Sequence, residues 1–308
     1  MNYIVFDLEW NQPEDGLKTE DRVLPFEIIE IGAVKLNEEL DAVSEFNMLI
    51  KPQVYHSINW RIRKMLELKP GELEKGTPFP EAAGKFLEWC GEDHVFCTWG
   101  SQDLTELQRN MNYHGLPDLS DKPIRYMNVQ KMYGVMNGIP SQTKALESAV
   151  DALGIEKDVP FHRAYSDAYY TAKILKLIPE EIRRKYKAYD VYHLPKNRKT
   201  QIKLKEGEKQ IVISTAYPTK EALMDDGIFT ALNCVKCSGK AVKQKIRWHS
   251  FNQRVYDAAG KCKEHGYLAS RIKIKHSDAG DVYGEKATRY ITEEEFLEMR
   301  KSLTKHKD

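Results

Sequence analysis

The sequence lacks several features that would assign it to whole classes of protein. It has no run close to the roughly 18 consecutive apolar residues that a membrane-spanning helix needs. It also lacks the basic stretch and small-residue cleavage site of a secretion signal, because the chain enters the apolar segment 3–6 at once. The five cysteines are few and odd in number, which argues against a secreted disulfide framework and leaves room for metal ligation. We therefore expect a cytoplasmic protein without a membrane partner.

The composition is that of an ordinary globular protein, with 41% hydrophobic and 30% charged residues over 308 positions. This length favours two domains. The near-neutral total charge hides a division: residues 181–308 hold 28 Lys and Arg against 17 Asp and Glu, whereas residues 1–180 hold 19 against 29. The basic half is therefore a candidate for contacting phosphates, the alternative being a solvated basic surface without a ligand.

Strand and helix patterns alternate in the first half, which predicts an α/β fold with a mixed sheet flanked by helices. Short turns between the first three strands predict that they are antiparallel neighbours. The expected strands are 3–8, 26–36, 43–50, 95–99 and 124–129, and the expected helices are 80–89, 103–111, 144–153 and 162–177.

The second half changes character. We expect a first domain over 1–185, a charged linker over 186–209, and a small basic α+β domain over 210–308. Within the last domain, the expected strands are 210–214 and 268–275 and the expected helices are 219–225 and 293–303. Thr292 with Glu295 forms a capping box that predicts the start of the last helix.

The first strand carries two acids, Asp7 and Glu9, on an otherwise apolar segment. Side chains two residues apart on a strand face the same side, so these carboxylates project together and repel one another. A divalent cation would relieve that repulsion. A pair of acids at a solvated strand end is the alternative explanation.

Two further segments add acids and a histidine. Asp103 follows a strand at the start of a helix, where a simple capping role is the alternative. His162 and Asp167 lie at the start of the long helix, so that Asp167 can point inward while His162 reaches over from the helix start. An exposed or capping histidine is the alternative for His162.

These residues, in this order and at these separations, resemble the DEDDh 3′→5′ exonucleases, the superfamily of ribonuclease T and the polymerase proofreading exonucleases. The resemblance covers residues 1–178 through four matched segments: F-D-L-E, E-I-I-E-I-G-A-V, T-W-G-S-Q-D-L and H-R-A-Y-S-D-A. It implies a ribonuclease H-like fold with a mixed five-stranded sheet. Trp99-Gly100 and Asn128 are similar to the branch of exoribonucleases that trim small and structured RNAs.

The resemblance also implies a mechanism, which is two-metal hydrolysis that releases nucleoside 5′-monophosphates. Asp7 is expected to contact two Mg²⁺ or Mn²⁺ ions, with Glu9 and Asp167 on one ion and Asp103 on the other side, partly through water. His162 is the expected general base that takes a proton from the attacking water.

A second metal site is predicted from four residues of the basic half. Cys234 and Cys237 form one short pair and Cys262 and His265 another, with 24 residues between the pairs. Each pair can occupy a tight turn and present two ligands to one tetrahedral Zn²⁺, which predicts a zinc-ribbon-like domain with a structural ion. Soft thiolates exclude Mg²⁺ from such a site. Reduced thiols without a metal are the alternative.

Residues near these ligands and near the acidic strand are candidates for substrate contact. Lys243, Lys245, Arg247 and Trp248 combine basic charge with an aromatic ring, as single-stranded nucleic acid binding requires. Trp10 stands where many DEDDh relatives have Thr or Ala, so it either stacks on the terminal base or belongs to the core.

The sequence therefore predicts a metal-dependent 3′→5′ exonuclease that binds 3′ ends of RNA or single-stranded DNA. A DNA-directed proofreading or repair enzyme is one alternative, and a catalytically weak nucleic-acid-binding scaffold is another. The basic domain is expected to bind nucleic acid, or else a protein partner.

Overall fold

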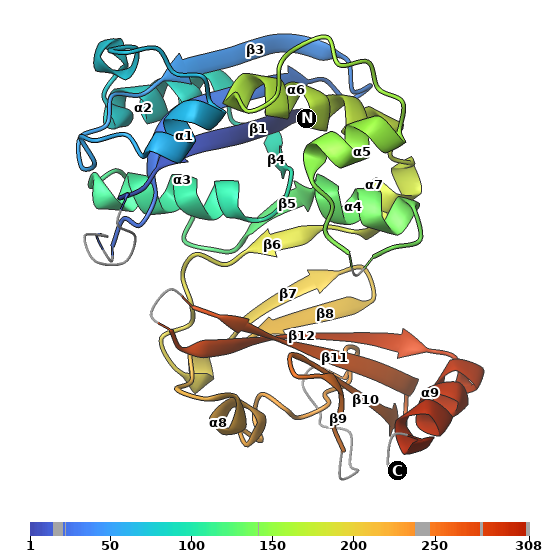
Figure 1. The fold of residues 1–308 in the computed structure, drawn as a ribbon. Helices are drawn as coiled ribbons and strands as arrows, with labels where there is room; N and C mark the ends of the chain where they lie inside the picture. Colours follow the sequence, from blue (N-terminus) through green and yellow to red (C-terminus); the bar gives the residue numbers. More distant parts are fainter. Residues whose placement is uncertain (15–20, 22, 141, 238–246, 278–279, 306–308) are drawn as a thin grey trace. The chain divides into compact units, whose positions relative to one another are not determined.

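The computed structural model describes residues 1–14, 21, 23–140, 142–237, 247–277 and 280–305, with the backbone alone for 302–305. The chain divides into two units, Met1–His193 and Leu194–Asp308, each of which has its own sheet (Figure 1). None of the helices in the described ranges is long and apolar enough to cross a membrane.

Unit 1 is built on a mixed sheet with the strand order β3-β2-β1-β4-β5-β6. The first three strands are antiparallel neighbours, as expected, β1–β4 and β4–β5 are parallel, and β6 returns antiparallel to β5. The strands are β1 (Asn2–Asn11), β2 (Glu27–Leu36), β3 (Ala42–Leu49), β4 (His94–Thr98), β5 (Ile124–Asn128) and β6 (Ala188–Asp190). The ribonuclease H-like mixed sheet is thus confirmed, with one strand more than the five expected.

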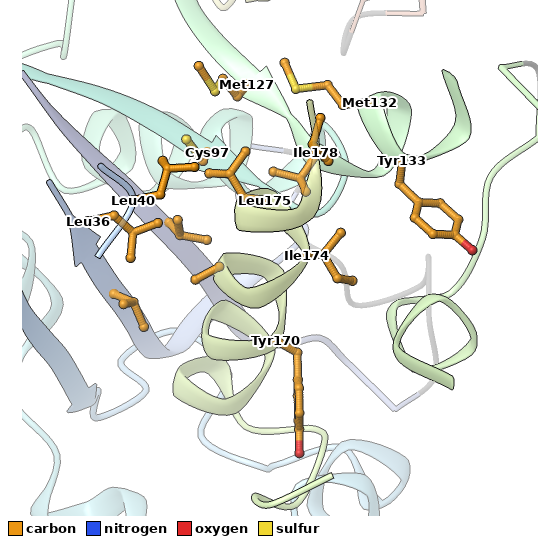
Figure 2. Packing of buried hydrophobic residues seen from close by; sticks show 14 of the residues in the cluster. Leu36, Leu40, Cys97, Met127, Met132, Tyr133, Tyr170, Ile174, Leu175 and Ile178 are labelled. Carbon is orange, nitrogen blue, oxygen red and sulfur yellow. The ribbon is translucent and has the colours of Figure 1, made fainter. Parts of the chain in front are cut away.

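Helices cover both faces of this sheet. They are α1 (Trp60–Met65), α2 (Phe79–Cys90), α3 (Gln102–Tyr113), α4 (Val129–Met136), α5 (Leu146–Ala152), α6 (Ala164–Leu177) and α7 (Glu180–Lys185), with a 3-10 turn η2 (Leu73–Lys75). The two-residue period of β1 divides the core, because Val5 packs with α6 while Phe6 and Leu8 pack with α2 and α3 on the opposite face. Figure 2 shows the α6 side, where Tyr170, Ile174 and Leu175 extend from the helix among buried residues.

The expected linker over 186–209 contains regular structure instead. It includes β6, a 3-10 turn η3 (Arg198–Thr200) and β7 (Ile202–Glu206). Asp190 of β6 accepts hydrogen bonds from Thr105 Oγ1 at 2.7 Å and Gln108 Nε2 at 2.5 Å, which ties the strand to α3. These elements give little signal in the sequence, because a three-residue strand is too short to show a period and the alternating lysines of β7 resemble a charged linker.

Unit 2 is a six-stranded antiparallel sheet with the order β7-β8-β12-β11-β10-β9. Its other elements are β8 (Lys209–Ile213), α8 (Lys220–Met224), β9 (His249–Asn252), β10 (Val255–Cys262), β11 (Gly266–His276), β12 (Val282–Ile291) and α9 (Glu293–Lys305). The capping box is present, since the Glu295 N–H donates to Thr292 Oγ1 and the Thr292 N–H donates to Glu295 Oε2.

The sequence had indicated only β8 and β11 in this sheet. Gly284 and Lys286 interrupt the apolar pattern of β12, so its residues show no clear strand period. Lys286 is nevertheless buried, because its Nζ donates to the carbonyls of Phe229 and Ala231, the second at 2.6 Å. A buried lysine of this kind is satisfied by backbone acceptors that sequence patterning does not reveal.

Candidate active site

Three carboxylates converge where β1 faces α6. Asp7 and Glu9 lie two residues apart on β1 and project toward the α6 side, as the strand period predicts. Asp167 comes from the first turn of α6. One oxygen from each of the three carboxylates lies within 4.8 Å of the other two, which is close enough for the acids to share a cation.

Asp103 joins this group from α3. It is buried, and its Oδ1 accepts a hydrogen bond from the Leu8 backbone N–H at 3.3 Å, so it lies beside β1 between the two strand acids. Ser101 is the N-cap residue of α3, which leaves Asp103 as a first-turn acid rather than the cap. Its charge raises the pKa of Asp7, which places Asp103 within electrostatic range of the three acids.

The start of α6 approaches the sheet at Gly32. A Cβ at this position would lie 1.9 Å from the Tyr165 backbone nitrogen, so only glycine permits this contact between β2 and α6. Gly32 pairs with Asp7 across the β1–β2 ladder. The close approach therefore brings the first turn of α6, and Asp167 with it, over the strand that carries Asp7.

His162 lies just before this helix in a left-handed conformation, with φ of 66°. Its backbone N–H donates to Asp167 Oδ1 at 3.4 Å, and its side chain is exposed. A positive φ is uncommon for a residue other than glycine and concentrates at functional positions. The expected helix start at His162 is thus two residues early, but the residue does lie beside Asp167.

The pKa values of these acids are raised, because the carboxylates are close together and have little contact with solvent. Burial raises the pKa of Asp7 well above its usual range, and the neighbouring carboxylates raise it further. Burial and Asp167 raise the pKa of Glu9 to about 8. Burial likewise raises the pKa of Asp103 to about 7 and that of Asp167 to about 6. Without a compensating cation, Asp7, Glu9 and part of the Asp103 population therefore retain protons near neutral pH, whereas Asp167 is mostly ionised.

The donor set fits hard divalent cations. All four acids offer oxygen, and their mutual repulsion is the property that a bound Mg²⁺ or Mn²⁺ would relieve. The arrangement can thus hold metal next to an exposed imidazole.

Two charged residues of this region, Glu30 and Arg163, were not predicted from the sequence to belong to the site. Glu30 of β2 is 1% exposed, and its carboxylate binds Arg163 Nε at 2.9 Å, directly after His162. Glu30 also pairs with Glu9 across the β1–β2 ladder. The available signal was an acid inside an otherwise apolar strand, in the segment E-I-I-E-I-G.

Asn11, at the end of β1, was missed as well. Its Nδ2 donates to the carbonyls of Tyr55 and Ser57, and its Oδ1 accepts the backbone N–H of Asn59. This buried amide thereby attaches the segment that precedes α1 to the end of the acidic strand.

The expected substrate contacts have mixed surroundings. Trp10 is half-buried and packs against the Phe26 ring, with the ring centroids 5.5 Å apart. These contacts are those expected if Trp10 belongs to the core. Trp248 donates from Nε1 to the Thr230 carbonyl at 3.0 Å and packs on the core of unit 2, while Arg247 is exposed. Lys243 and Lys245 lie outside the described residues.

In unit 2, Cys234, Cys237, Cys262 and His265 come together as the spacing predicts. His265 Nδ1 lies 3.7 Å from the Cys234 Sγ, 3.8 Å from the Cys262 Sγ and 2.9 Å from the Cys237 Sγ, and the Cys237 and Cys262 sulfurs are 3.5 Å apart. A tetrahedral zinc with thiolate and imidazole ligands separates its ligand atoms by about 3.5–3.8 Å. Three of these four distances match, and the fourth is shorter.

Unit 1 therefore has the fold and the acidic site of a metal-dependent phosphodiester hydrolase of the ribonuclease H-like class. Residues 4–175, more than half of the chain, match the RNase_T exonuclease family, and the chain belongs to this family of 3′→5′ exonucleases.

Individual relatives match the chain over different lengths. The chain is 26% identical over 195 residues to a PolC-type DNA polymerase III of Clostridium perfringens (strain 13 / Type A), and it spans 12% of that much longer protein. The nuclease domain of 3′hExo, described as a DEDDh family member bound to rAMP, is 22% identical with a TM-score of 0.50, covering 57% of this chain and 90% of that one. Exonuclease I of E. coli in complex with a dA16 oligonucleotide is 14% identical with a TM-score of 0.49, covering 69% and 54%.

Proposed function

We propose that this protein removes nucleoside 5′-monophosphates one at a time from the 3′ end of RNA or single-stranded DNA. The observation that carries the proposal is the convergence of Asp7, Glu9 and Asp167 within 4.8 Å, with His162 held next to Asp167. In this proposal Asp7, Glu9, Asp103 and Asp167 hold two Mg²⁺ or Mn²⁺ ions. The ions supply charge stabilisation for the attacking and leaving oxygens of the phosphodiester.

His162 acts as the general base in this scheme. Its exposed imidazole accepts a proton from the attacking water. The nearby Asp167 carboxylate stabilises the resulting imidazolium, since the two groups are close enough for His162 to lower the pKa of Asp167.

The direct test is digestion of 5′-labelled and 3′-labelled RNA and DNA oligonucleotides with purified protein and Mg²⁺ or Mn²⁺. We expect a ladder from the 5′ label that chelator abolishes, and immediate release of a mononucleotide from the 3′ label. Comparing RNA with DNA of one sequence decides the substrate class, and internal cuts alone would overturn the proposal.

His162→Ala tests the assignment of the base. We expect kcat to fall about 10²- to 10⁴-fold, the range that general-base catalysis contributes, while oligonucleotide binding stays unchanged. Full activity in this variant would contradict the assignment. His193 offers a matched control as His193→Ala, because its Nε2 pairs with Asp118 Oδ2 at a distance of 3.0 Å and neither residue is one of the acids of the site.

We further propose that Cys234, Cys237, Cys262 and His265 bind one structural Zn²⁺. The matching ligand separations support this, as does Tyr290, whose hydroxyl lies 2.9 Å from the Cys234 sulfur and accepts the Lys236 N–H. Such outer contacts orient ligands in structural zinc sites. Metal analysis of Cys234→Ser should show a loss of one zinc per chain, with Cys90→Ser as the control; equal zinc in both would remove the site.

The basic excess of the second half supports a role for unit 2 in holding nucleic acid. A protein partner is the alternative. Oligonucleotide affinity that falls steeply with salt for the whole chain, and much less steeply for fragment 1–193, would distinguish the first role from the second.

A further inference from the structure

Glu30 occupies an unusual position for a carboxylate. It is almost fully buried in β2, opposite Glu9 in the ladder, within a group that already holds four acids. Burial raises the pKa of Glu30, whereas Arg163 and the backbone N–H of Ala164 lower it by stabilising the charged form. A buried acid is retained at such cost only where its partners compensate it.

Both partners of Glu30 belong to the turn that starts α6. Arg163 is the N-cap residue of this helix, its own side chain makes no capping hydrogen bond, and Ala164 is the first helical residue. Glu30 thus provides, from a distant strand, an anion at a helix N-terminus that lacks a local cap. Its neighbour on the same face of β2, Gly32, admits the backbone of Tyr165.

His162 lies immediately before these anchored residues. Its left-handed backbone donates an N–H to the Asp167 carboxylate, and the residue that follows it, Arg163, binds Glu30. A conformation of this kind costs free energy and persists only where the surroundings impose it. The next residue, Arg163, is anchored by an ion pair with Glu30, with 2.9 Å between Nε and Oε2.

We propose that Glu30 is a positioning residue for His162, acting through Arg163 and the first turn of α6. The inference rests on the proposed function, in which His162 is the general base. In this role Glu30 acts through Arg163 and fixes the direction from which the imidazole meets the attacking water.

A double-mutant cycle tests this role. Glu30→Gln keeps the shape of the side chain and removes its charge, and we expect kcat to fall about 10- to 100-fold with KM changed less than about twofold, as for a misplaced catalytic group. In the His162→Ala background the same substitution should lower kcat no further, because a residue that acts only through His162 has nothing left to position.

Two control substitutions change the charges around Arg163. Glu72 Oε1 lies 3.7 Å from Arg163 Nη2 and is more exposed than Glu30. Glu72→Gln therefore removes an equal charge but leaves the Glu30–Arg163 ion pair in place, and it should leave kcat within about twofold. Arg163→Gln breaks the ion pair from its other side and should reproduce the cycle, which keeps the test decisive if thermal unfolding shows Glu30→Gln to be unfolded.

Each remaining outcome is informative. Equal losses from Glu30→Gln with and without His162 would overturn the positioning role and leave the base assignment intact. Wild-type kcat in folded Glu30→Gln would overturn it as well. Full activity of His162→Ala would instead overturn the proposed base, and the positioning role with it.

Discussion

At the residue scale, the site depends on a few positions that require one particular type of side chain. Asp7 and Glu9 were recognisable because a strand period places them together, and His162 with Asp167 because they open a helix. The proposed role of Glu30 could not be predicted from the sequence, because it depends on Arg163, which lies 133 residues away in the chain. A single strand shows which face an acid occupies, but not which distant cation approaches it.

Gly32 offers a sharp test at this scale. In Gly32→Ala, the new Cβ would meet the backbone of Ala164 and Tyr165, so α6 must move away from β1. We expect a loss of about 1–3 kcal/mol in the free energy of unfolding, the usual range for overpacking, together with most of the nuclease activity. Chemical denaturation and a 5′-label assay measure the two effects.

The matched control is Gly84→Ala, on the exposed face of α2, where the added Cβ meets nothing within 4 Å. It should stabilise the protein by up to about 1 kcal/mol, because alanine favours a helix interior, and leave activity unchanged. Equal behaviour of the two variants would contradict the close approach of α6 to β2.

At the element scale, the longer segments of unit 1 were predicted well and the short ones were not. The expected helix 162–177 corresponds to α6, since the segment is long and Pro179 follows its end. In contrast, β6 owes its existence to α3, because Asp190 is held by Thr105 and Gln108. A strand fixed by tertiary hydrogen bonds leaves no period in its own three residues.

This difference predicts where unit 1 can be cut. A fragment 1–193 keeps β6 on the edge of the sheet and should fold cooperatively with nuclease activity on short oligonucleotides. A fragment 1–185, which ends at the boundary expected from the sequence, exposes the edge of β5 and leaves two α3 side chains without their acceptor. It should unfold at a lower temperature and aggregate more readily, as calorimetry and light scattering would show; identical unfolding of both fragments would contradict a structural role for β6.

At the scale of the whole molecule, the acidic group links stability to pH and to metal. The pKa values of Glu9, Asp103 and Asp167 are about 8, about 7 and about 6, above the values near 4 of an unfolded chain. Between about pH 4 and pH 8 the folded, metal-free protein therefore binds more protons than the unfolded chain. The contribution of these groups to stability is greatest at the acidic end of that range and is lost as pH rises.

Divalent cations should reverse this loss, since they replace the protons. We expect Mg²⁺ or Mn²⁺ to raise the Tm more at pH 8 than at pH 6, and Glu9→Gln to reduce that difference. Thermal unfolding in chelator and in metal at both pH values measures it. A metal-induced gain of equal size at pH 6 and pH 8 would argue against the four acids as the ligands.

The two faces of β1 have different functions, so different positions of the strand should tolerate substitution under different selections. Ile4, Phe6 and Leu8 support one half of the core, whereas Asp7 and Glu9 serve the chemistry on the other face. A library of substitutions along β1 selected for folding alone should tolerate changes at the acids and reject them at the apolar positions. Selection for nuclease activity should reject changes at both sets of positions. The positions where changes are rejected only under this second selection should therefore recur every two residues along the catalytic face of β1.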